Sequence, residues 1–158
     1  MAKPPSSNTL WQFSLALYPK MQSLCLDWQD RFGLNVNLLL LLCYLEQQQL
    51  SLTSQQLQQL AAKLDSFSRQ FTQPLRTLRR SSSSASLAAT QQQHLKQTLL
   101  QAELSLEQLE QQLLLEYCPP LIAKAQPLIE LYLAQLNAQS QALPAQIIDL
   151  RQALQQLS

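Results

Sequence analysis

The stretch LAATQQQHLKQTLLQAELSLEQLEQQLLLEY, residues 87–117, decides the fold class of this chain. It contains no glycine and no proline, and its apolar residues recur every three or four positions, which places them on one face of an α-helix. The whole chain of 158 residues contains one glycine, whereas an average chain of this length carries about 11. Tight hairpins and phosphate-binding loops need glycine. We therefore expect an all-α protein, a single-domain bundle of about seven or eight helices.

One face of this stretch has the heptad spacing of a coiled coil. Its members step alternately by four and three residues, namely Leu95, Leu99, Ala102, Leu106, Leu109 and Leu113. Such a seam packs either inside the bundle of its own chain or against a second copy of the chain. The spacing leaves both alternatives open, so a homodimer is one of the expected assemblies.

Turn-forming residues divide the chain into segments. We expect residues 1–7 to be a disordered tail, residues 8–118 to be one helical domain, and residues 119–158 to be C-terminal helices that pack on that domain. Pro19 is expected to end the first helix, and Gly33 to end the second as a C-cap.

Further boundaries follow from capping residues and prolines. Asn35 and Thr53 are expected to cap the third and fourth helices, and Pro74 to start a short one. The serine-rich stretch 81–86 is expected to be a flexible link, and a helix is expected over about 121–138.

The bulk composition excludes several classes of function. Charged residues make up 13% of the chain and the formal net charge is +1, so we expect no general attraction to nucleic acid or to anionic membranes. The helix surfaces are filled instead by 28 glutamines beside 38 leucines. The longest apolar run, Leu38–Leu45, is too short to span a bilayer, which needs about 20 residues. No apolar run follows Lys3, so we expect no signal peptide and a cytoplasmic location.

Cysteine and histidine give little indication of catalysis or of a cofactor. Cys25, Cys43 and Cys118 are far apart in the sequence and form no C-x-x-C motif, which favours reduced thiols. His94 is the only histidine, and no E-x-x-H motif of the kind used in helical di-iron sites occurs. We therefore expect no metal and no cofactor, and no catalytic residue is assigned.

Against this neutral background, two charged stripes are conspicuous. Arginines at i, i+3 and i+4 share one helix face, and glutamates stepping by four and three share another; they are Arg76, Arg79, Arg80, Glu103, Glu107 and Glu110. If the long helix folds back antiparallel on the arginine helix, the two stripes can form ion pairs. The alternative is that the arginine face binds an external anion or RNA, although it lacks the aromatic residues that usually accompany nucleic-acid binding.

A second polar group precedes the leucine-rich run. Asp30 and Gln29 are followed by Asn35 and Asn37, and together these side chains can form a hydrogen-bond network at the start of the third helix. The closely spaced pair of Asp27 and Asp30 also permits acid–base or Mg²⁺ chemistry. Because no second Asp-rich helix accompanies the pair, the capping network is the preferred interpretation.

Four blocks of sequence carry a resemblance to a known family. They are LWQFSLALY at 10–18, CLDWQDRFGLNVNLLLLL at 25–42, QPLRTLRR at 73–80 and AELSLEQLEQ at 102–111. Together they resemble a family of short, uncharacterised bacterial proteins with a domain of unknown function, over about residues 8–115. The blocks contain the same polar residues that the spacing singles out, together with Gly33. The part of the chain after about residue 119 departs from the family pattern.

The resemblance implies no activity. Genes of such proteins lie beside those of ribosome-associated ATPases, which implies a translation-linked protein partner. From the residues and the resemblance together, we expect a non-enzymatic protein–protein interaction or adaptor module. The alternatives are an anion- or RNA-binding module that uses Arg76, Arg79 and Arg80, and an apolar-ligand binder or enzyme with a pocket between helices.

Overall fold

The structure is a computed structural model that describes residues 2–157, and its regular elements in that range are all helical. The all-α prediction is therefore confirmed. Met1 and Ser158, which belong to the expected tail and to the expected C-terminal region, lie outside the described residues. The α-helices are α1 (Ser7–Phe32), α2 (Val36–Gln47), α3 (Ser54–Phe67), α4 (Gln73–Arg80), α5 (Ala89–Tyr117), α6 (Leu128–Gln135) and α7 (Leu143–Gln155). A π-helical turn, Ser68–Thr72, joins α3 to α4, and a 3₁₀ turn, Ser82–Ser84, follows α4.

The helices are fewer than the seven or eight expected. Because α3, the π turn and α4 follow one another without a break, the described residues form six separate helical rods. Pro19 does not end the first helix: α1 continues through it with a kink at Met21, where φ is −125° and ψ is 21°. A proline inside a helix removes one hydrogen bond and bends the axis, and here the helix resumes after the bend.

The segment between α5 and α6 is the other departure from the expected boundaries. The helix expected over about 121–138 begins only at Leu128, because prolines at 119, 120 and 127 disfavour helical backbone before them. The chain instead runs extended, and its backbone forms isolated antiparallel bridges from Leu121 to Ala2 and from Ile122 to Ser51. Ala2, in the segment expected as a tail, is thereby hydrogen-bonded to the body of the protein.

The capping residues act as their sequence positions predict. Gly33 ends α1 with a φ of 69°, the left-handed conformation that glycine adopts without strain. The side chain of Asn35 caps α2 by accepting a hydrogen bond from the Leu38 N–H at 3.0 Å. Thr53 and Gln56 form a capping box at the start of α3.

Helix α2 lies at the centre of the hydrophobic core. The leucines at positions 38 to 42 are all at most 4% exposed. This helix is apolar on every side because it contacts α1, α5, α6 and α7. Within residues 2–157, no helix has the length and apolar character that crossing a membrane requires.

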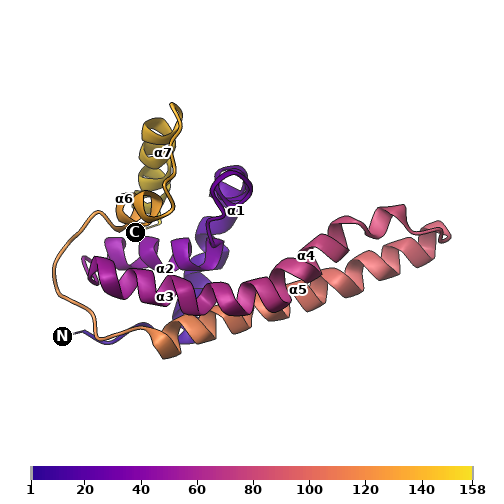
Figure 1. The fold of residues 1–158 in the computed structure, drawn as a ribbon, viewed down its shortest axis with the longest axis horizontal. Helices are drawn as coiled ribbons and strands as arrows, with labels where there is room; N and C mark the ends of the chain where they lie inside the picture. The colour runs from indigo at the N-terminus through magenta and orange to yellow at the C-terminus, as the bar shows by residue number, and fades with distance from the viewer. Residues whose placement is uncertain (1, 158) are drawn as a thin grey trace.

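The molecule has a body and a projecting arm. Figure 1 shows α4 and the adjoining part of α5 extending away from α1, α2, α6 and α7 as a two-helix hairpin. The serine-rich stretch expected as a link forms the tip of this arm, where the 3₁₀ turn reverses the chain. Helix α5 therefore runs antiparallel to α4, as the paired-stripe interpretation requires.

The heptad seam is not the buried face of α5. Its member Leu109 is 44% exposed and Ala102 is also exposed, whereas Glu103, Glu110 and Gln111 are each at most 4% exposed. The polar stripe of α5 is buried because Glu103 meets the arginines of α4 within the arm and Glu110 meets the polar start of α2 in the body. The face of α5 that is buried is therefore the one that has hydrogen-bond and ion-pair partners, and not the one that the leucine spacing predicts.

The C-terminal helices contribute to the same core. Leu150 and Leu154 of α7 are 1% and 6% exposed, and α7 contacts α1 and α2. The indole N–H of Trp28 donates to the side-chain oxygen of Gln146 at 3.0 Å. The apolar face of α7 therefore covers the protein's own core and is not free for a partner.

We expect Leu150→Ala to lower the free energy of unfolding by about 2–5 kcal/mol, because it leaves a cavity beneath α7. Ile148→Ala on the same helix is the matched control: Ile148 is 57% exposed, so the change should stay within about 0.5 kcal/mol. Urea unfolding followed by circular dichroism measures both. Equal, small effects would contradict the assignment of α7 to the core.

Candidate functional site

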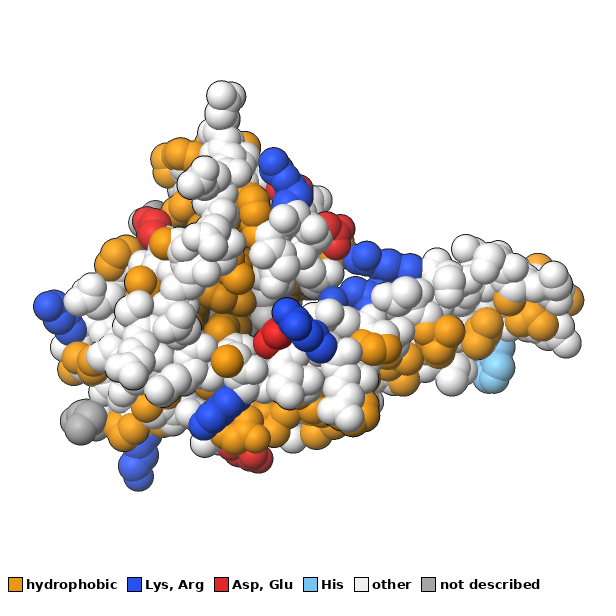
Figure 2. Space-filling view, in the orientation of Figure 1, with side chains coloured by type: hydrophobic (Ala, Val, Ile, Leu, Met, Phe, Trp, Pro, Cys, Tyr) orange, Lys and Arg blue, Asp and Glu red, His pale blue; other side chains and the backbone are white. Residues whose placement is uncertain are grey.

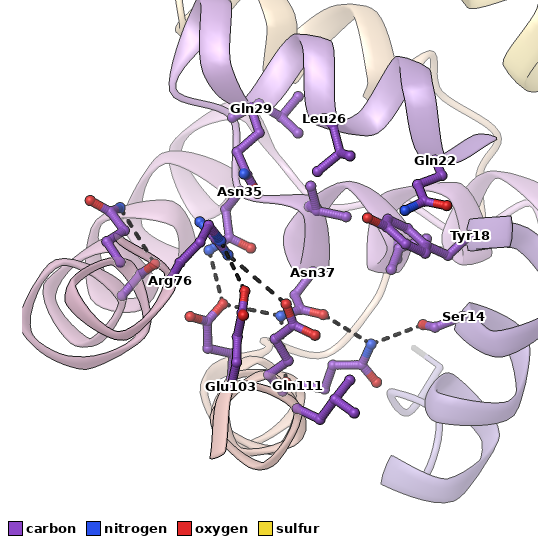
Figure 3. Close-up of a pocket in the computed structure, with 18 of the residues that line it drawn as sticks. Ser14, Tyr18, Gln22, Leu26, Gln29, Asn35, Asn37, Arg76, Glu103 and Gln111 are labelled. Carbon is purple, nitrogen blue, oxygen red and sulfur yellow. Dashed lines mark hydrogen bonds and ion pairs between the residues drawn. The ribbon is translucent and has the colours of Figure 1, made fainter. Parts of the chain in front are cut away.

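A pocket of about 820 Å³ lies between α1, the start of α2 and the α3–α5 side of the arm. All ten polar residues that the sequence singled out line it; they are Gln29, Asp30, Asn35, Asn37, Arg76, Arg79, Arg80, Glu103, Glu107 and Glu110. Figure 3 shows Tyr18, Gln22 and Gln29 of α1 on one side of the pocket, with Glu103 and Gln111 of α5 on the other. In Figure 2, basic side chains gather where the arm leaves the body.

The arginine and glutamate stripes meet at Glu103. The Arg76 Nε donates to one carboxylate oxygen of Glu103 at 3.2 Å, and the Arg79 Nε donates to the other. The side chain of Glu103 is 6% exposed, so two guanidinium groups hold a carboxylate that is almost out of water. Arg76 also approaches Glu107, with 3.9 Å between Nη2 and Oε1. These contacts join α4 to α5 across the pocket wall.

Arg80, the third arginine of the stripe, and the nearby Arg69 have other partners. Arg80 lies 3.7 Å from the carboxylate of Asp30, so it connects the arm to α1. Arg69 pairs with Asp65 one helical turn away, and both of these side chains are exposed. The four arginines therefore do not form one free basic surface.

Amide side chains form the floor of the pocket. The Nδ2 atoms of Asn35 and Asn37 donate to the same oxygen of Glu110, at 3.0 and 3.1 Å. The Nε2 of Gln111 donates to the Asn37 Oδ1 and to the Ser14 Oγ, at 3.1 and 2.9 Å. Figure 3 shows this row running from Asn37 through Gln111 to Ser14. The row fixes the start of α2 against α1 and α5.

Two oxygen atoms on this floor have no hydrogen-bond partner among the described residues. They are the Oε2 of Glu110 and the Oε1 of Gln111, and both residues are 2% exposed. Buried acceptors normally have a partner, because leaving one unpaired costs about 1–3 kcal/mol. The floor of the pocket is thus short of hydrogen-bond donors.

Glu107 lies in an environment that favours its protonated form. Burial in the pocket wall raises the pKa of Glu107 to about 7, and the negative charge of Glu103 adds to the effect, while Arg76 opposes it. The group therefore changes its protonation near neutral pH, where small changes in its surroundings shift its charge.

The thiols of the chain are unsuited to catalysis. Burial raises the pKa of Cys25 to about 12 and that of Cys118 to about 11, and it raises the pKa of Cys43 as well. The reactive thiolate form is therefore disfavoured at neutral pH. Within residues 2–157, no group of three His, Cys, Asp or Glu side chains is placed to hold a metal ion.

Several lining residues were not among the sequence candidates. Ser14 and Tyr18 of α1 and Gln111 of α5 are examples. Ser14 is a polar residue within a strongly apolar helix, and that contrast could have identified it. Gln111 is one of 28 glutamines, and nothing in its sequence position distinguishes it from those at the surface.

The fold and the site define a small all-α protein with one charged, partly enclosed pocket among the described elements. Residues 9–114 match the model of the family described as "Protein of unknown function (DUF2390)", and the chain belongs to that family. Every residue that lines the pocket falls inside this range. Searches of curated proteins and of solved structures returned no match.

The ion pair between Arg79 and Glu103 predicts energetic coupling. In a double-mutant cycle of Arg79→Ala and Glu103→Ala, we expect a coupling energy of about 0.5–3 kcal/mol, because the carboxylate is buried. The pair of Arg69 and Asp65 is the control, with side chains 75% and 46% exposed, and should couple by less than about 0.5 kcal/mol. Both coupling energies are measured by urea unfolding. Equal values in the two cycles would contradict the claim that the buried pair stabilises the fold more than the exposed pair.

The raised pKa of Glu107 predicts a pH dependence of stability. Because folding raises this pKa from 4.5 to about 7, the native chain binds more protons than the unfolded chain between those values. The free energy of unfolding therefore falls as pH rises through this window. In Glu107→Gln we expect the free energy of unfolding to decrease less with pH. Between about pH 5 and pH 8 the decrease should be smaller than in the wild-type protein by about 1–3 kcal/mol. Glu116→Gln, also on α5 and exposed, is the matched control. An unchanged slope in Glu107→Gln would contradict the prediction.

Proposed function

We propose that this protein is a non-catalytic binding protein whose pocket receives a small polar ligand. The observation that carries the proposal is the convergence of eight charged side chains on one pocket of about 820 Å³, in a chain with only 13% charged residues. Ligand pockets in proteins typically have volumes of about 300–1,000 Å³ and a few converging polar groups. The pocket lies between separate helices whose positions are fixed by ion pairs and capping bonds, so it is largely preformed.

Binding is favoured over catalysis by the partners of the lining groups. Glu103 is held by two arginines, and one oxygen of Glu110 is held by two asparagine amides. Groups committed in this way orient a ligand well but are poorly placed to transfer protons. Among the lining groups with resolved shifts, Glu107 alone has a pKa near neutral pH.

The anion- or RNA-binding alternative has weaker support. It requires arginines that are free to meet phosphate groups, whereas Arg76, Arg79 and Arg80 each have a carboxylate partner. An incoming anion would have to compete with Glu103, which is already buried against two of them. The geometry therefore favours an internal, structural use of Arg76 and Arg79.

A protein–protein interaction role is the second candidate. Leu78 and Leu87 of the arm are 54% and 43% exposed, and Leu109 of the heptad seam is 44% exposed. Because heptad spacing suits the packing of like helices, the proposed occupant is a second copy of this chain. A monomer at all concentrations in sedimentation equilibrium would contradict it. The translation-linked partner and the cytoplasmic location, with its reduced thiols, stay predictions.

The pocket proposal predicts ligand-dependent stabilisation that a filled pocket abolishes. In thermal unfolding with a library of small polar metabolites, a ligand at about 100 times its Kd should raise the Tm by about 5–10 °C. Gln22→Trp places a large side chain at the pocket wall and should abolish the shift. Ser23→Trp, on the same helix but outside the lining, is the matched control and should retain it. The proposed function would be overturned if no compound in the library raised the Tm of the wild-type protein in a way that Gln22→Trp abolishes.

A further inference from the structure

The charges of the pocket are unbalanced toward the negative side. Its lining holds five carboxyl groups and three arginines. Two of the arginines share Glu103, and the third reaches Asp30, while Asp65 has Arg69 outside the lining. Glu107 is left with a long contact of 3.9 Å to Arg76, and Glu110 meets only neutral amides. The carboxyl groups without a close cationic partner are therefore those of Glu107 and Glu110.

The unpartnered oxygens give a second, independent observation at the same place. The orientation of the Gln111 amide follows from its neighbours: the Ser14 hydroxyl donates to the Leu10 carbonyl, so Ser14 must accept from Gln111. Likewise Asn37 donates to Glu110, so its oxygen faces Gln111. Gln111 must therefore use its N–H groups on both sides, and its Oε1 is left without a donor, as is the Oε2 of Glu110.

The two unpartnered oxygens call for a hydrogen-bond donor, and the surplus of carboxyl groups favours a donor that carries positive charge. A phosphate or carboxylate brings only acceptors and would repel Glu107 and Glu110. A guanidinium or ammonium group brings several N–H donors and a positive charge, and a guanidinium presents its donors as a planar fork that matches a carboxylate. Leu15 and Leu104, which are 52% and 37% exposed, also line the pocket and offer apolar surface to an alkyl stem.

We propose, resting on the proposed function above, that the pocket binds a compact organic cation, an alkylguanidinium or alkylammonium. Its N–H groups donate to the partly exposed carboxyl group of Glu107 and, once the Glu110 side chain rotates to bring its buried Oε2 into the pocket, to Glu110, while its alkyl part contacts Leu15 and Leu104. Binding of positive charge beside Glu107 also favours the ionised form of that group, so the protein releases protons on binding near neutral pH.

The test uses four probes on the full-length chain by isothermal titration calorimetry at about pH 7. The probes are n-butylguanidinium, n-butylammonium, inorganic phosphate and n-butylurea, a neutral compound of nearly the same shape as the first. We expect n-butylguanidinium to bind at least about tenfold more tightly than n-butylurea. Its binding should release protons, which is measured by comparing buffers of different ionisation enthalpy.

Variants locate the binding. Glu110→Gln should weaken n-butylguanidinium at least about tenfold, and Glu116→Gln, on the exposed face of α5, should leave it unchanged. If Glu110→Gln fails to fold, as judged by circular dichroism, Glu107→Gln replaces it and should abolish the proton release as well as weaken binding.

Three outcomes would overturn the inference. The first is equal affinity for n-butylurea and n-butylguanidinium. The second is tighter binding of inorganic phosphate than of n-butylguanidinium. The third is an absence of cation binding together with a crystal structure in which ordered water is bound to the Glu110 Oε2 and the Gln111 Oε1. Each of these leaves the proposed function standing if some other library compound stabilises the protein in a manner that Gln22→Trp abolishes. Failure of every compound in that screen overturns both proposals.

Discussion

The enclosure of α2 is the constraint on which the rest of the structure depends. A helix of leucines on every side has to be surrounded, and α1, α5, α6 and α7 do so. Its N-terminus is therefore also inside the protein, and the unpaired N–H groups that every helix start carries must find partners there. Asn35 caps the helix with its side chain, while its own N–H donates to the Tyr132 hydroxyl at 3.0 Å. The remaining amide groups of Asn35 and Asn37 turn to Glu110 and Gln111. The polar floor of the pocket is thus a consequence of burying a helix end.

Local physics explains the features that could be predicted from the sequence. Gly33, Asn35 and Thr53 mark helix ends because backbone conformation and capping bonds depend on a few neighbouring residues. The spacing of the arginines and glutamates identified residues that share a face, and the antiparallel hairpin then brought Glu103 to Arg76 and Arg79. The ten candidates line one pocket because the charged residues share helix faces, because α4 and α5 form an antiparallel hairpin, and because the start of α2 lies beside that hairpin.

The features that could not be predicted depend on long-range packing. The leucine seam of α5 has the stronger hydrophobic period, yet the glutamate face is the buried one, because its partners come from α2 and α4 and are not visible in the sequence of α5 itself. The π turn at Ser68–Thr72 is another example: one extra residue per turn rotates the next helix by about 100°, which changes the face that α4 presents. Gln111 became a functional candidate only when α1, α2 and α5 were placed side by side, where it meets Ser14 and Asn37. Residues 119–157 lie beyond the family match, but Tyr132 supports the pocket floor from there.

The gathering of charged side chains in one pocket affects how molecules of this protein interact with one another in solution. Eight of the 21 charged side chains line one pocket, and several of the others form pairs on the body. Many exposed positions hold glutamine, whose amide is well hydrated but carries no charge. With a net charge of +1 and an isoelectric point near 7.7, neighbouring molecules in solution repel one another very weakly at neutral pH. Its solubility therefore depends on hydration of amide groups more than on electrostatic repulsion, and passes through its minimum close to physiological pH.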